Sequence, residues 1–172
     1  MIESELKPDN KKIFTKPNFT SVTRQLAATH VDAVLAVLDF ISKFNVKEIV
    51  IGEGLGTGDT FAGFRNFCYL KLRKDYEVEL LDLNQDEYEL VEILDENFNL
   101  FKIRVAKTVL EFDYRVSISP LKTHDFVILT LGLKNLVVGS VVSEDKRFIR
   151  QAISGIAKLQ DWEVLMLIKL RF

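Results

Sequence analysis

Cysteine is nearly absent from this sequence of 172 residues, and its scarcity excludes several kinds of protein. Cys68 stands alone, so the chain has no second cysteine for an internal disulfide. It also lacks the set of thiolates that holds an iron–sulfur cluster, so we expect no such cluster from this chain alone. The composition suits a reducing compartment, and we expect a cytoplasmic protein.

An excess of charge of either sign is also missing. Lys and Arg number 23 and Asp and Glu number 25, and a formal net charge of −2 leaves no broad positive field to hold nucleic acid or an anionic membrane. No apolar run approaches the length of a membrane span, and residues 1–12 lack the apolar core of a secretory signal. We therefore exclude nucleic acid and membranes as partners. We interpret the chain as one domain over residues 1–172, with residues 1–12 as a frayed leader.

The usual motifs for metals and nucleotides are missing as well. The two histidines, His30 and His124, have no metal-binding spacing, so we expect no metal site from protein groups alone. His30 stands beside a predicted helix start and is best explained as a cap or a surface residue. Residues 52–58 form a glycine-rich turn between a strand and a helix, but Thr57 stands where a dinucleotide loop needs glycine. The turn is either a glycine-permitted bend or a ligand contact at a helix N-terminus, without a nucleotide cofactor.

The first half of the chain alternates between strand and helix patterns. A short strand ends at Pro17, apolar residues recur at helical spacing over 30–44, and a β-branched strand follows at 47–51. We expect a second helix over 59–74 and a strand over 76–83. This alternation predicts an α/β fold with an open, mostly parallel sheet and helices on both faces, which is a three-layer arrangement.

The second half departs from this alternation. Residues 88–94 and 100–106 are strand-like runs joined by a turn at 95–97, which predicts an inserted β-hairpin. The other elements that we expect are a short helix near Val109, a strand over 115–119, a helix capped by Ser143 and a terminal strand over 163–170.

The stretch Leu121–Asn135, LKTHDFVILTLGLKN, places polar side chains at both ends of an apolar run. Lys122 and His124 precede the run and Lys134 and Asn135 end it, so we expect one small pocket. The lysines would bind an anion or, when desolvated, act as nucleophiles, and an imidazole transfers protons near neutral pH. Lys122, His124 and Lys134 are therefore the catalytic candidates. The alternative is that the two lysines only solvate the ends of a strand or helix.

Short motifs recur in the order and spacing of a known family. They are Lys16-Pro17-Asn18, Thr29-His30, Gly52-Glu53-Gly54, Asp59-Thr60, the KTH of 122–124 and the LKN of 133–135, followed by Gly139. With these motifs the chain resembles, over about residues 13–142, the family named domain of unknown function 362. Its members occur in archaea and bacteria, and some are fused to ferredoxin-type iron–sulfur modules. The resemblance implies an α/β fold and a site near the KTH and LKN segments, without an established activity.

Our leading hypothesis is a domain that binds a small anionic molecule, such as a carboxylate or a phosphate compound. One wall of the pocket would come from the KTH and LKN segments, and the opposite wall from Lys16, Asn18, Glu53 and Thr60. The fused relatives suggest a competing hypothesis, an accessory module for a redox partner of ferredoxin type without catalysis of its own. A third is a degenerate relative that keeps only the fold. We also consider a homodimer, because a short sheet needs covering.

Overall fold

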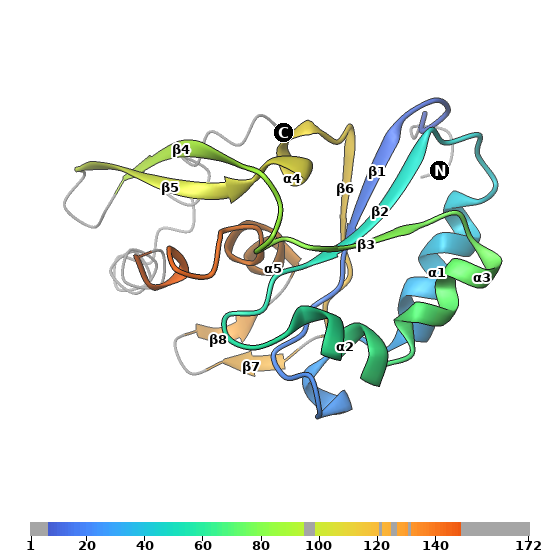
Figure 1. Cartoon of the computed structure of the whole chain (residues 1–172), viewed down its shortest axis with the longest axis horizontal. Coiled ribbons are helices and arrows are strands. Elements are labelled where there is room, and N and C mark those ends of the chain that lie inside the picture. Colours follow the sequence, from blue (N-terminus) through green and yellow to red (C-terminus); the bar gives the residue numbers. More distant parts are fainter. Residues whose placement is uncertain (1–6, 95–98, 121, 125–126, 131, 149–172) are drawn as a thin grey trace.

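A parallel sheet of four strands is the centre of the fold (Figure 1). The structure is a computed structural model that describes residues 7–94, 99–120, 122–124, 127–130 and 132–148, with the backbone alone for residues 94, 122–124, 127–130 and 133. The order of the sheet is β3-β2-β1-β6, and every neighbouring pair is parallel. These strands are β1 (Lys12–Lys16), β2 (Glu48–Glu53), β3 (Glu79–Asp82) and β6 (Tyr114–Ser117).

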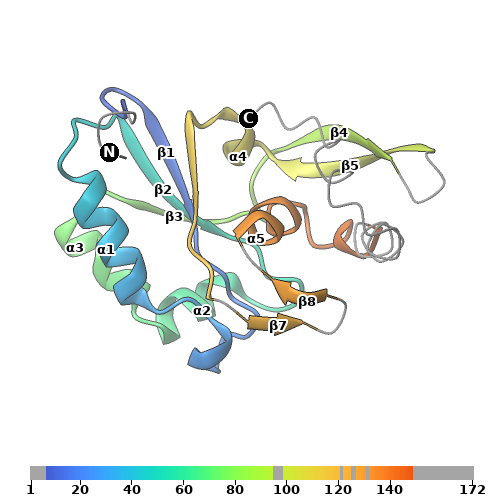
Figure 2. The same ribbon diagram turned by 180° about the vertical axis from the view of Figure 1, so that it is seen from behind.

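Helices cover both faces of this sheet (Figures 1 and 2). One face carries α1 (Val31–Ile41), α2 (Thr60–Asn66) and α3 (Leu72–Asp75). The other face carries α4 (Lys107–Glu111) and α5 (Gly132–Gly139). The chain is therefore built in three layers.

Two clusters of buried side chains follow the alternation of the strands. Ile13 of β1 packs with the helices α1 to α3, whereas Phe14, the next residue, packs with Leu136 of α5. In β2, Ile51 belongs to the first cluster and Val50 to the second. Both faces of the sheet are buried, as the nearly continuous apolar strands predict. The expected α/β fold with a mostly parallel sheet and flanking helices is confirmed.

A β-hairpin extends from this body. Its strands, β4 (Tyr88–Leu94) and β5 (Leu100–Ala106), pair antiparallel over the residues that the sequence predicted. Ile103 and Val105 pack against Val141, which follows α5 in the chain. The hairpin is thus attached to the body through the segment after α5.

The helix expected over 59–74 is broken, and that prediction was wrong. α2 ends before Cys68, whose φ of 65° is left-handed, and a single 3-10 turn then leads into α3. The rings of Phe67 and Tyr69 both pack edge-on against Phe19, with centroids 5.4 and 5.1 Å from it. Residues two apart in a continuous α-helix project about 200° apart, so both rings reach Phe19 only because the helix is interrupted.

Two polar residues cap helices as expected. The Nδ1 atom of His30 accepts a hydrogen bond from the backbone N–H of Asp32 at the start of α1 (3.3 Å). Asp59 accepts one from the backbone N–H of Phe61 at the start of α2 (2.8 Å). The interpretation of His30 as a cap is therefore confirmed.

A second antiparallel pair precedes α5. It consists of β7 (Lys122–His124) and β8 (Val127–Thr130), which come from the stretch that brackets the predicted pocket. Within the described ranges, no helix combines the length and the apolar character that a membrane crossing requires. The turn expected at 95–97 lies outside the described residues, and so do the strand expected over 163–170 and the part of the expected helix that follows residue 148.

Candidate functional site

The carboxyl ends of the four parallel strands form one edge of the sheet. β1 ends at Lys16 beside Ser117 of β6, and β2 ends at Glu53 beside Asp82 of β3. The chain runs outward from β1 to β2 and β3 and then returns as β6 on the other side of β1. The hydroxyl of Ser117 donates to the carbonyl of Gly132 (2.9 Å), so α5 begins at this edge. Open α/β sheets bind ligands where the strand order reverses in this way.

Lys16 and Glu53 form a buried ion pair at this edge. The Lys16 Nζ lies 2.8 Å from the Glu53 Oε1, and the two side chains are 0% and 3% exposed. The same Nζ donates to the carbonyl of Pro17 (3.3 Å), and the backbone N–H of Gly54 donates to the same Oε1 (3.0 Å). Charges removed from water need such additional hydrogen bonds. Two residues predicted for the site are therefore in direct contact.

The second oxygen of the Glu53 carboxylate, Oε2, is buried and accepts no hydrogen bond from the described part of the chain. A buried acceptor without a partner costs about 1–3 kcal/mol, and more when it is charged. The nearby phenol of Tyr69 instead donates to the carbonyl of Thr29 (2.9 Å). Burial, and to a lesser extent the charge of Glu53, raise the pKa of Tyr69 well above its usual value of 10.0, so the phenol keeps its proton.

Asn135 connects the ends of β1 and β6 to α5. Its side chain is 6% exposed. Its Oδ1 accepts a hydrogen bond from the side-chain amide of Asn18 (2.9 Å). Its Nδ2 contacts three acceptors, the carbonyls of Lys16 (3.1 Å) and Pro17 (3.2 Å) and the hydroxyl of Ser117 (3.0 Å), which share its two hydrogens. The predicted residue Asn135 is thus a junction at this edge.

Lys146 also belongs to this edge, although no motif in the sequence indicated it. The residue is 4% exposed, and its Nζ donates to the carbonyl of Gly54. The preceding residue, Asp145, accepts two hydrogen bonds from the guanidinium of Arg104 in β5, at 2.8 and 3.0 Å. Lys146 stands in a charged run, Glu144–Arg147, where nothing in the sequence distinguishes it from a surface lysine.

Two glycines allow the backbone and the lysines to lie close together. A β-carbon at position 139 would lie 2.2 Å from the Cε and 2.7 Å from the Nζ of Lys16. A β-carbon at position 54 would lie 3.2 Å from the carbonyl of Gly139 and 3.3 Å from the Nζ of Lys146. Gly54 and Gly139 therefore permit the close approach of α5 and its following turn to the ends of β1 and β2.

Two further predicted residues lie beside this group. Thr60 is fully buried, and its Oγ1 accepts a hydrogen bond from the backbone N–H of Leu55 (3.4 Å), so it closes the glycine-rich turn. Asn18 is half-buried and reaches the site through Asn135. Asn18 is therefore at the rim, while Thr60 supports the turn.

The remaining predicted residues come from β7 and α5. Lys134 is half-buried on α5. Lys122 and His124 belong to β7, of which the structure describes only the backbone. The predicted closeness of the Lys122 and Lys134 side chains therefore stays a prediction. Across the described ranges there is no group of three His, Cys, Asp or Glu side chains suited to a metal ion.

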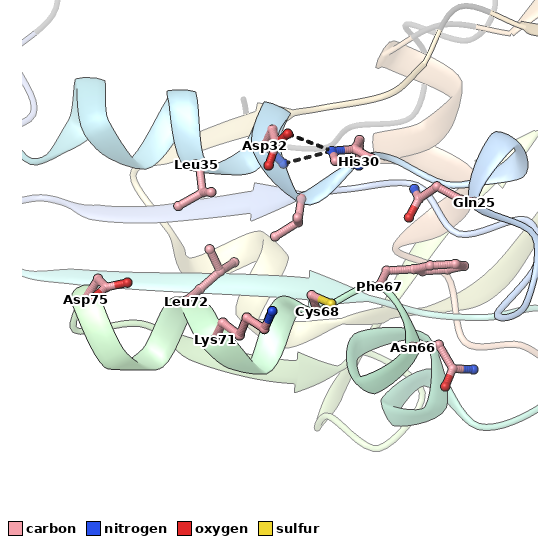
Figure 3. Close-up of a pocket in the computed structure, with 11 residues that line it drawn as sticks. Gln25, His30, Asp32, Leu35, Asn66, Phe67, Cys68, Lys71, Leu72 and Asp75 are labelled. Carbon is pink, nitrogen blue, oxygen red and sulfur yellow. Dashed lines mark hydrogen bonds and ion pairs between the residues drawn. The ribbon is translucent and has the colours of Figure 1, made fainter.

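A separate hollow of about 400 Å³ lies between the start of α1 and the segment of α2 and α3 (Figure 3). In it, His30 faces Asp32, the residue whose backbone it caps. None of the eight predicted site residues lines this hollow, so it is distinct from the carboxyl edge. Its lining consists of Gln25, His30, Val31, Asp32, Leu35, Asn66, Phe67, Cys68, Lys71, Leu72 and Asp75.

Comparison with known proteins agrees with the resemblance to a family. The model of the family described as Domain of unknown function (DUF362) matches residues 13–163. No curated protein matches the sequence. Because the family model covers most of the chain, the chain belongs to the DUF362 family.

Proposed function

We propose that this domain binds a small anionic molecule, in the cytoplasm, at the carboxyl edge around Lys16, Glu53 and Asn135. The observation that carries the proposal is the ion pair of Lys16 and Glu53, buried at the ends of two adjacent parallel strands. Replacing a buried ion pair by apolar side chains is often neutral or stabilising, so stability alone is a weak reason for such a pair. Its place at the ligand-binding edge of an open α/β sheet is a stronger reason.

Lysines would supply the positive charge that attracts the anion. Lys16 lies beside Glu53, and Lys146 contacts the next residue, Gly54. Lys134 precedes Asn135 on α5 and is half-buried, so it would meet a ligand arriving from solvent. An ammonium group is a strong partner for a carboxylate or a phosphate. The other predicted residues keep a place in the proposed site. Asn18 would lie at its rim, Thr60 would support the glycine-rich turn, and Lys122 and His124 of β7 would contact the ligand.

Calorimetric titration with inorganic phosphate and with acetate tests this proposal. The informative variant is Lys16→Gln/Glu53→Gln, which removes both charges and leaves two amides of similar size to hydrogen-bond each other. The matched control is Lys12→Gln/Glu48→Gln, because Lys12 and Glu48 form an ion pair of 2.8 Å at the other end of the same two strands. Circular dichroism confirms that each variant is folded.

We expect the native chain and the control to bind at least one of the two anions, and the Lys16→Gln/Glu53→Gln variant to bind it at least tenfold more weakly. An affinity that is the same in all three proteins would contradict the assignment of this edge. The absence of phosphate and carboxylate binding by the native chain would contradict the proposed function as a whole.

The accessory-module hypothesis is a second candidate, and one observation favours it. Tyr88, Leu90 and Leu100 are exposed on one face of the β-hairpin, together with the ion pair of Glu92 and Lys102, and a partner would bind this mixed face. If a ferredoxin binds there, Leu90→Glu should abolish its co-elution with the chain. Leu26→Glu is the control, because Leu26 is exposed outside the hairpin. Loss of co-elution in both variants, or no complex with the native chain, would count against this candidate.

A further inference from the structure

The carboxylate of Glu53 is held by contacts to only one of its two oxygens. Oε1 accepts hydrogen bonds from the Nζ of Lys16 at 2.8 Å and from the backbone N–H of Gly54 at 3.0 Å. Oε2 is buried and accepts none from the residues that the structure describes. An ionised carboxylate accepts hydrogen bonds at both oxygens, so much of the capacity of this group is unused within the protein.

Two donors of this region are bound to other acceptors. The phenol of Tyr69 donates to the carbonyl of Thr29 (2.9 Å), and the ammonium of Lys146 donates to the carbonyl of Gly54. Buried acceptors are almost always satisfied in proteins. An open acceptor at the ligand-binding edge of a sheet therefore points to a donor that arrives with the ligand.

We propose that the Oε2 of Glu53 accepts a hydrogen bond from the ligand, which therefore carries a hydroxyl or ammonium group next to its anionic group. This inference rests on the proposed anion site. The two points of recognition are close, because the ammonium of Lys16 lies 2.8 Å from the other oxygen of the same carboxylate. A donor on the carbon adjacent to a ligand carboxylate would reach Oε2 while that carboxylate faces the lysines. The ligand class is a small hydroxy acid or amino acid.

A metal ion fits the open oxygen less well than a hydrogen-bond donor. A metal ion needs several ligands of its own, whereas the other oxygen of this carboxylate already accepts from the ammonium of Lys16. The described ranges also lack a group of three metal-ligating side chains. A water molecule would satisfy Oε2, and the experiment below separates it from a ligand group.

Acetate, glycolate and glycine test the inference, because they differ only in whether one carbon carries hydrogen, a hydroxyl or an ammonium group. In calorimetric titrations of the full chain we expect glycolate and glycine to bind at least tenfold more tightly than acetate, since hydrogen bonds to an ionised acceptor are the strong ones. Equal affinities for the three acids would mean that Oε2 holds only water, which overturns the inference and leaves the proposed function standing. If neither these acids nor phosphate bind, the proposed function and the inference both fail.

The variant Glu53→Gln sharpens the test. Its amide oxygen retains the two contacts of Oε1, and its NH₂ group replaces the acceptor Oε2 by a donor. The ammonium of glycine then faces a donor, so the preference for glycine over acetate should disappear, whereas glycolate, whose hydroxyl also accepts, should keep part of its advantage. Glu48→Gln on the same strand is the control and should leave all ratios unchanged.

A Glu53→Gln protein that retains the preference for glycine would overturn the inference. If this variant does not fold, the binding of lactate and propionate to the native chain is compared instead, because these two acids again differ by one hydroxyl. A preference of at least tenfold for lactate supports the hydrogen bond to Oε2, and equal binding overturns it.

Discussion

Lys16 and Gly139 are packed so closely that no side chain fits between them. A β-carbon at position 139 would lie 2.2 Å from the Cε of Lys16, which is fully buried and held by Glu53. The last residue of α5 and the last residue of β1 therefore define each other's position. This contact couples the helix that carries Asn135 to the ion pair at the carboxyl edge.

Gly139→Ala should destabilise the chain. The added methyl group must displace a buried ammonium from its carboxylate, and overpacking of this kind costs about 1–3 kcal/mol. Gly132→Ala is the matched control at the other end of α5, where a β-carbon would meet only ordinary contacts of 3.4 Å to Ser117. Urea unfolding should show loss of stability in the first variant and little change or a small gain in the second. Equal stabilities would contradict the packing argument.

Lys16→Met should lower the stability of the chain more than the loss of both charges together. It leaves a buried carboxylate uncompensated, which costs about 3–5 kcal/mol, whereas Lys16→Met/Glu53→Leu leaves no unpaired charge. We expect the double variant to be more stable than Lys16→Met alone in a double-mutant cycle measured by urea unfolding. The same cycle on Lys12 and Glu48, which are about one third exposed, should show little coupling. A strictly additive cycle at Lys16 and Glu53 would show that the pair is not energetically linked.

Asn135→Ala should destabilise the chain by about 2–4 kcal/mol, because it removes the hydrogen bonds that a buried amide makes with the carbonyls of Lys16 and Pro17 and with Asn18 and Ser117. Asn66→Ala is the control, since Asn66 is exposed and donates one hydrogen bond to the carbonyl of Val22 (2.9 Å). Thermal unfolding should separate the two variants clearly. Similar melting temperatures would mean that Asn135 is not a structural junction.

Asp145→Asn should destabilise the chain at neutral pH and much less in acid. Hydrogen bonds from Arg104 hold the pKa of Asp145 below its usual 3.8. A carboxyl whose pKa is lower in the folded chain contributes its full stability above 3.8 and loses it as the pH falls toward the folded value. Urea unfolding at neutral pH and at steps below 3.8 should therefore show the native chain and the variant converging.

Arg104→Met provides the control for this pH dependence. It removes the guanidinium donors, which contribute most to the lowered pKa of Asp145, and leaves the backbone N–H of residue 104, so it should flatten most of the acid response. Adding Asp145→Asn should then change the response little further. A difference between the native chain and Asp145→Asn that stays constant below pH 3.8 would contradict the linkage.

Local pattern was enough to predict most of the fold. The helical period over 30–44 and the apolar strand at 47–51 correspond to α1 and β2, and the paired runs 88–94 and 100–106 are the hairpin. These predictions succeed because burial imposes a period on residues that are close in sequence. The break at Cys68 escaped prediction because its cause, the ring of Phe19, lies far away in the chain.

The candidate site also has features that local sequence predicts and features that depend on distant contacts. Neighbouring residues were enough to predict that Lys16 and Glu53 lie at or just beyond the ends of strands and that Asn135 lies beside an apolar run, since these are local properties. Contacts between distant segments pair Lys16 with Glu53 and bring Lys146 to the same edge. They also leave Oε2 without a partner among the described residues. The physical reason is that hydrogen bonding and desolvation depend on distances between groups separated by many residues, and only the packing of α5 against the parallel strands sets those distances.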